Sequence, residues 1–165
     1  MNDDLIKCIN KVRLFLNQTE DSILFGHIKN GIDNFDESCF GKSYSEFLRI
    51  CDGLWLGEVD LYGVKALLSN QYLTSEIEIS KSDWLCIGNI NSDYGYLMME
   101  RSTENIYLFY EGYFYKGAGY DHAYCLLGDL NYFLTNYVFG ELYASISSSI
   151  DDDKWYDFLK KNLND

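Results

Sequence analysis

The stretch from Ser43 to Gly57 reads Ser-Tyr-Ser-Glu-Phe-Leu-Arg-Ile-Cys-Asp-Gly-Leu-Trp-Leu-Gly and carries the strongest local pattern in the chain. Its apolar positions recur at the spacing of one helix face, namely Tyr44, Phe47, Leu48 and Cys51. Ser43 and Glu46 have the spacing of a capping box, in which two side chains satisfy N–H groups of the first turn. Gly53 is expected to end the helix in a left-handed conformation. The stretch therefore predicts a helix, a sharp stop and a turn into a sheet.

The remainder of the chain places helices before and after a strand-rich middle. Helical stripes occur at 3–16, 129–139 and 151–163, whereas 23–41 is rich in turn residues. Short apolar runs between turn clusters predict strands at 58–64, 76–80, 84–87, 96–100, 106–110 and 113–115. Because the connections are short, neighbouring strands should pair antiparallel. We predict an α+β fold with a mostly antiparallel, twisted sheet of about five to six strands.

Length and composition favour one domain spanning 1–165. The chain has 165 residues, of which 47% are apolar, so a core can form without disulfides or a structural metal. The five cysteines are odd in number and form no Cys-x-x-Cys pair, which indicates small buried side chains in a reducing compartment. With only two histidines, a clustered zinc site is not expected. No signal peptide or membrane span is recognisable, so we expect a cytoplasmic protein.

The charge of the chain favours some partners over others. The formal net charge is −13 and the isoelectric point is near 4.4. Nucleic acids and anionic membranes attract basic surfaces, so neither is expected as a partner. A basic protein would instead be attracted over long range. The alternative is that the charge serves solubility alone.

The helix with its Phe47-Leu48 pair, closed by the Asp52-Gly53 step before a strand, resembles the SUKH superfamily. This superfamily groups Smi/Knr-type fungal cell-wall-assembly regulators with bacterial immunity proteins against polymorphic toxins. The resemblance covers about 43–139, although Phe40-Gly41 stands where family members usually carry Leu-Pro. It implies a helix, a twisted sheet and a following helix. It also implies an immunity protein that neutralises a toxin domain, possibly a nuclease, or alternatively a regulatory scaffold without a toxin partner.

Residues suited to catalysis are sparse. A nucleophile needs an adjacent base, and the candidate group is Asp121, His122 and Cys125, which keeps a small uncharacterised enzyme as a further alternative. The carboxylate pairs Glu58/Asp60 and Glu76/Glu78 fit a solvated strand face better than acid–base catalysis. We expect no catalytic residue, no metal and no cofactor, and Asp151 to Asp153 should cap the last helix.

A protein-binding surface is the favoured function. Tyrosines supply contact area with a polar tip, and acids supply charge complementarity. The candidate contact residues combine these chemistries with predicted loop or strand-end positions: Glu58, Asp60, Asp93, Tyr94, Glu111, Tyr113, Tyr120 and Asp121. The protein is expected to be a monomer or a weak dimer.

Overall fold

The computed structural model describes residues 1–75, 84–90, 95–110, 124–148 and 150–162. Within these ranges the helices are α1 (Asp3–Gln18), α2 (Lys42–Ile50), α3 (Val64–Asn70), α4 (Leu130–Phe133) and α5 (Lys154–Asn162). The strands in the same ranges are β1 (Gly26–Ile28), β2 (Leu54–Leu56), β3 (Val59–Leu61), β4 (Trp84–Ile90), β5 (Gly95–Glu100), β6 (Asn105–Tyr110) and β7 (Tyr124–Asp129).

The strands form one antiparallel sheet in which each strand pairs with the next along the chain. This confirms the predicted α+β class, but the described residues contain seven strands rather than five to six. The strand predicted at 58–64 is shorter than expected, because β2 and β3 form a hairpin and α3 already begins at Val64. The three-residue strand β1 lies in the turn-rich stretch, where no strand was predicted. The strands predicted at 76–80 and 113–115 lie outside the described residues.

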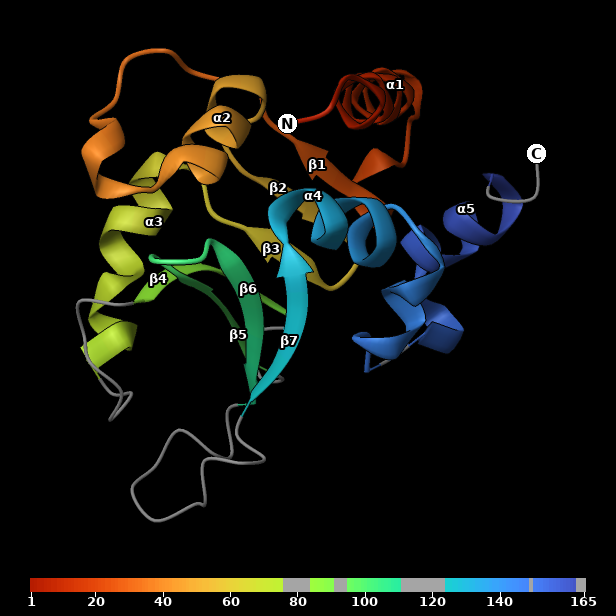
Figure 1. The fold of residues 1–165 in the computed structure, drawn as a ribbon. Helices are drawn as coiled ribbons and strands as arrows, with labels where there is room; N and C mark the ends of the chain where they lie inside the picture. Colours follow the sequence, from red (N-terminus) through yellow and green to blue (C-terminus); the bar gives the residue numbers. More distant parts are fainter. Residues whose placement is uncertain (76–83, 91–94, 111–123, 149, 163–165) are drawn as a thin grey trace.

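One face of the sheet packs into the hydrophobic core. Side chains alternate between the faces of a strand, so Leu54, Leu56, Val59 and Leu61 all point to the same side and all are buried. The stripe on α1 that was expected to face the core is buried too: Leu5, Ile9, Val12 and Leu16. Figure 1 shows α1 and α2 along the top of the sheet, with α3 and α5 at opposite sides. This arrangement confirms the helices predicted at both ends of the chain.

The predicted capping box of α2 is wrong. The helix begins at Lys42, and the Glu104 carboxylate accepts hydrogen bonds from the backbone N–H groups of Lys42 (2.5 Å) and Ser43 (3.1 Å). The Ser43 hydroxyl instead faces the Met99 sulfur at 3.9 Å, and the Glu46 carboxylate contacts the amino group of Met1. The first turn of α2 is therefore capped by a residue from the turn between β5 and β6.

The Asp52-Gly53 step joins α2 to the sheet and to α3. Gly53 has φ of +89°, as expected, but it lies two residues after Cys51, which closes the helix, and not directly after it. A Cβ atom at Gly53 would lie 2.6 Å from the backbone nitrogen of Gly63, so only glycine fits this approach. The Asp52 carboxylate accepts a hydrogen bond from Val64 N at 2.8 Å and thereby holds the first turn of α3.

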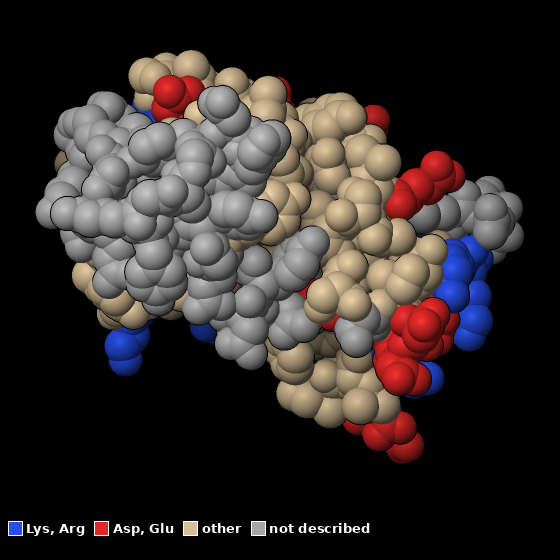
Figure 2. All heavy atoms as spheres, turned by 90° about the horizontal axis from the view of Figure 1, so that it is seen from below, with Lys and Arg blue, Asp and Glu red and all other residues tan. Residues whose placement is uncertain are grey.

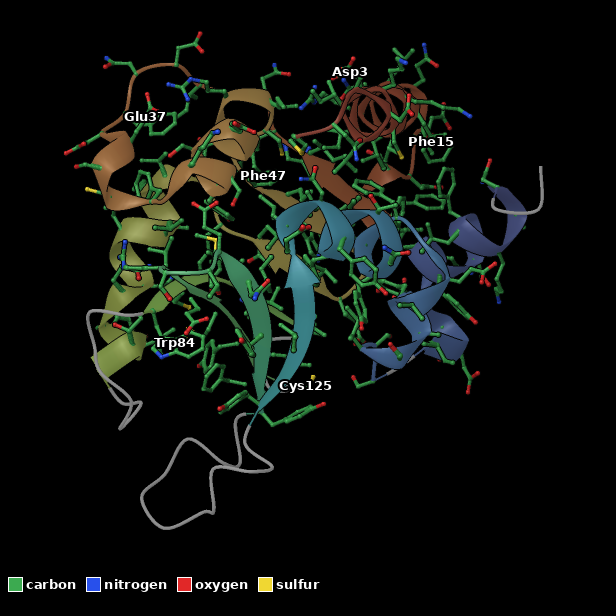
Figure 3. All side chains as sticks on the ribbon, in the orientation of Figure 1. Asp3, Phe15, Glu37, Phe47, Trp84 and Cys125 are labelled. Atoms are coloured by element: carbon green, nitrogen blue, oxygen red, sulfur yellow. The ribbon has the colours of Figure 1, made fainter. Side chains whose placement is uncertain are left out.

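The C-terminal region agrees with the predicted helices. α4 continues as a π-helix over Leu134–Val138, which together cover most of the predicted 129–139 segment. Asp153 caps α5, because its Oδ1 accepts from the backbone N–H of Trp155 at 2.8 Å. Trp155 is fully buried and its indole N–H donates to Val138 O at 2.9 Å. Figure 3 shows Phe15 on the side of α1 that faces α5, where its ring lies 4.6 Å from that of Phe158.

Two further expectations concern the burial of the cysteines and the presence of a membrane-spanning helix. All five cysteines are free, and Cys51 and Cys86 are buried as expected, while Cys8, Cys39 and Cys125 are half-buried. Among the helices of the described ranges, none combines the length and the apolar character needed to cross a bilayer.

Candidate functional site

A row of side chains crosses the face of the sheet opposite to the core-facing leucines. Strand register pairs His27 with Trp55, Trp55 with Asp60, and Asp60 with Asn89. Residues that are directly opposite on antiparallel strands share a face, and neighbouring strands lie about 4.8 Å apart. Four strands therefore bring these four side chains into one line. We call this line, with its continuation below, the cross-strand row.

The cross-strand row continues through aromatic residues to the other edge of the sheet. Asn89 pairs with Tyr96, Tyr96 with Phe109, and Phe109 with Tyr124. The rings of Phe109 and Tyr124 stack at 4.9 Å, and Trp84 meets Phe109 edge-on at 5.1 Å. One end of the cross-strand row is thus polar and the other aromatic, and Tyr124 keeps 36% of its surface exposed.

A pocket of about 460 Å³ opens over the polar end of the cross-strand row. We call it the Asp60 pocket. Its walls come from β1 to β4 and from α3, and they include the side chains of His27, Lys29, Trp55, Asp60, Tyr62 and Asn89. The volume lies within the range of about 300–1,000 Å³ typical of ligand sites. The mixture of an indole, a carboxylate, an amide and a phenol in one concavity can provide both stacking and hydrogen bonds.

Trp55 forms an exposed and fixed wall of the Asp60 pocket. Its side chain is 42% exposed although Leu54 and Leu56, its neighbours in β2, are buried. The indole N–H donates to the carbonyl oxygen of Gly57 at 2.7 Å. This bond holds the orientation of the ring, so that little conformational entropy is left to lose when another molecule stacks on it.

Asp60 is a half-buried residue that lines the Asp60 pocket. Among the described residues, no hydrogen bond or ion pair reaches its oxygens. Burial raises the pKa of Asp60 above its ordinary value, because the charged form loses hydration, and the positive charge of Lys29 opposes this shift. A carboxylate in this setting favours a bound cation.

Asn89 and Tyr62 form the polar wall beside Asp60. The Asn89 amide N–H donates to the Tyr62 hydroxyl at 2.9 Å, which leaves the amide oxygen as an acceptor. Burial raises the pKa of Tyr62 to about 12, so the phenol stays protonated at neutral pH. Tyr62 is itself fixed, because its carbonyl oxygen accepts the Tyr44 hydroxyl at 2.7 Å. A side chain of α2 therefore holds the backbone of Tyr62 in place.

Glu58 was predicted alongside Asp60, but the structure gives it a different setting. It lies in the turn between β2 and β3, where its carboxylate accepts hydrogen bonds from Ser148 N at 2.7 Å and from the Ser148 hydroxyl at 3.2 Å. Its backbone N–H donates to the Tyr143 hydroxyl at 2.8 Å. Glu58 therefore ties the sheet to the C-terminal region, while Asp60 faces the Asp60 pocket.

The other predicted contact residues, Asp93, Tyr94, Glu111, Tyr113, Tyr120 and Asp121, lie outside the described residues. The same holds for His122 and for the Glu76/Glu78 pair. Of the possible catalytic group, the structure describes Cys125, whose Sγ lies 3.6 Å from the Tyr110 hydroxyl. Figure 3 places Cys125 and Trp84 toward the lower end of the sheet, away from α1 and α2.

Of the side chains named in the Asp60 pocket, the sequence prediction included Asp60 and missed five: His27, Lys29, Trp55, Tyr62 and Asn89. The signal for Trp55 was present, because Leu54-Trp55-Leu56 alternates apolar, exposed aromatic, apolar, which places the indole opposite to the core. No comparable signal exists for His27, whose place in the cross-strand row depends on the pairing of β1 with β2.

Charge is unevenly distributed over the face of the molecule that Figure 2 shows. In Figure 2 the largest groups of acidic and basic side chains gather at the right-hand end, the side on which α5 lies in Figure 1. Within the ranges that the structure describes, no three His, Cys, Asp or Glu side chains lie close enough to hold a metal ion.

No protein-family model and no curated protein sequence matches the chain.

Proposed function

We propose that the chain is a non-enzymatic protein-binding module whose partner is a basic protein, specifically a toxin domain that it neutralises as an immunity protein. The observation that carries the proposal is the cross-strand row, in which the exposed indole of Trp55 lies beside the Asp60 carboxylate, to which no described residue donates a hydrogen bond. Aromatic anchors next to a charged group are typical of the residues that dominate binding energy. The net charge of −13 supports attraction of a basic partner.

The resemblance to the SUKH superfamily supports the immunity role in particular. The order of helix, antiparallel sheet and following helix agrees with the architecture that the resemblance implies. A regulatory scaffold of the same superfamily would use a surface of the same kind, so the identity of the bound protein separates the two roles.

The proposal is tested by binding to the protein encoded next to this chain. We expect co-purification and an affinity that falls when NaCl is raised from about 0.05 to 0.5 M, because screening weakens charge attraction. Trp55→Ala and Asp60→Lys should each weaken binding at least tenfold, which is about 1.4 kcal/mol or more. The matched control is Asp21→Lys, an exposed acid outside the Asp60 pocket, which should change affinity by less than about threefold.

Two results would count against the proposal. One is the absence of binding by any protein encoded beside this chain while the wild-type protein is folded. The other is binding that neither salt nor the Trp55 and Asp60 variants change. Thermal unfolding of each variant separates a lost contact from a lost fold.

A further inference from the structure

The Asp60 pocket contains a charged group whose hydrogen-bonding capacity is unused. An ionised carboxylate can accept about four hydrogen bonds, and among the described residues Asp60 accepts none. Partial burial also removes part of its hydration, which water on the open side restores only in part. A cationic donor that enters the Asp60 pocket would satisfy the carboxylate and replace the lost hydration.

A second acceptor lies on the neighbouring strand. Asn89 is the direct cross-strand partner of Asp60, and its amide is oriented by the bond to the Tyr62 hydroxyl. With the N–H group directed to Tyr62, the amide oxygen is free to accept from a ligand. Two acceptors on adjacent strands therefore border one side of the Asp60 pocket, and both line the same cavity.

The opposite neighbour of Asp60 is an aromatic surface. Trp55 pairs with Asp60 on the other side, and its indole is held by the hydrogen bond to Gly57 O. Indole is the side chain that attracts a cation most strongly over its face. Carboxylate, amide oxygen and indole thus occur side by side across β2, β3 and β4.

We propose that the Asp60 pocket binds the guanidinium group of an arginine side chain presented by the partner protein. This inference rests on the proposed function and specifies the chemistry of its contact. A planar guanidinium has donors along its edges for Asp60 and Asn89 and a flat face for Trp55. A lysine ammonium is more strongly hydrated and has no flat face, so arginine fits the three walls better.

Lys29 limits the affinity of the Asp60 pocket for a cation. It is an exposed residue that also lines the cavity, and its charge acts on Asp60 without a direct ion pair among the described contacts. Its backbone is fixed by a hydrogen bond from Lys29 N to Gly53 O, while the long side chain can turn away. An incoming guanidinium must therefore overcome repulsion from Lys29, and removing this charge should strengthen binding.

The test is a titration of the isolated full chain with N-acetyl-arginine-N-methylamide, followed by nitrogen-15 NMR. We expect saturable shifts of the Trp55 indole N–H and of the Asn89 side-chain amide, with a dissociation constant of about 1–10 mM for a single side chain. The citrulline analogue has the same shape without the charge and should bind at least tenfold more weakly. The lysine analogue should also bind more weakly than arginine.

Two variants of the Asp60 pocket shift the expected affinity in opposite directions. Asp60→Asn removes the charge at nearly constant volume and should weaken arginine binding at least tenfold, whereas Lys29→Gln should strengthen it by about two- to fivefold. Asp21→Asn, an exposed acid outside the cavity, should leave the affinity unchanged. Equal binding of the arginine and citrulline probes, or arginine shifts that Asp60→Asn leaves intact, would overturn the assignment.

The failure of this inference can be told apart from the failure of the proposed function. If the neighbouring protein binds with an affinity that Asp60→Asn leaves unchanged, the module binds a protein but the arginine contact is wrong. If that protein does not bind while the arginine probe does, the Asp60 pocket recognises guanidinium and the proposed partner is wrong.

Discussion

Replacing Glu104 with alanine should lower the free energy of unfolding by about 0.8–3 kcal/mol. The Glu104 carboxylate accepts hydrogen bonds from the first two N–H groups of α2, at 2.5 Å from Lys42 and 3.1 Å from Ser43. Losing an N-cap acceptor costs about 0.5–2 kcal/mol. Losing a negative charge at the positive end of the helix costs about 0.3–1 kcal/mol more. Glu104 has a φ of +56°, and alanine would carry the same backbone strain there. The strain therefore does not contribute to the difference between the two proteins.

The assay is urea and thermal unfolding, with three variants that separate the contributions. A loss of this size lowers Tm by roughly 2–12 °C for a chain of this length. Glu104→Gln keeps an acceptor without the charge and should lose about half as much. Glu104→Gly removes the cap but relieves the left-handed strain, so it should be more stable than Glu104→Ala by about 1–2 kcal/mol.

Ser43→Ala is the control that can refute the reasoning. In a capping box this substitution would cost about 1 kcal/mol. In the structure the Ser43 hydroxyl faces only the Met99 sulfur at 3.9 Å, so we expect a change below about 0.5 kcal/mol. If Ser43→Ala proves as destabilising as Glu104→Ala, the helix is capped locally and the long-range cap is wrong.

Three other substitutions or modifications test the packing. Tyr143→Phe should cost about 1–2 kcal/mol in urea unfolding, because the buried hydroxyl bonds to Glu58 N at 2.8 Å. Gly53→Ala should cost more than about 1 kcal/mol in thermal unfolding, since φ is +89° and the Cβ atom would meet backbone. Burial raises the pKa of Cys51 and of Cys86 to about 12, so both thiols should resist a thiol reagent at about pH 8 until urea unfolds the chain.

The sequence predicts those features of the fold that depend on neighbouring residues. The stripe on α2 and the buried stripe on α1 follow from periodicity, which is a local property. The cap of α2 does not, because Glu104 lies 62 residues from Lys42 and reaches it only after β5 and β6 pair. Ser43 and Glu46 have the spacing of a local cap, so the sequence predicted them. No spacing rule can identify Glu104, the residue that caps α2 in the structure.

The candidate site shows the same limit in another form. Val59-Asp60-Leu61 alternates, so the sequence can place Asp60 on the face opposite to the core. Sequence alternation cannot say which residues lie beside it, since that depends on the register of β2, β3 and β4. The sequence also predicted the same role for Asp60 and Glu58. In the structure Asp60 lines the Asp60 pocket, whereas the Glu58 carboxylate accepts a hydrogen bond from Ser148.

Asp60 lowers the stability of the free folded protein, and this is an argument for a binding role. Because burial raises its pKa, the folded chain holds a proton there more tightly than the unfolded chain does. Ionisation of Asp60 as the pH rises therefore opposes folding, and an asparagine would avoid this cost. An ionised Asp60 lowers the stability of the free protein, and functional sites are where local rules of stability are commonly broken. A bound guanidinium would lower the pKa of Asp60, because a nearby positive charge favours the ionised carboxylate. The ionised group would then stabilise the complex, although it destabilises the free protein.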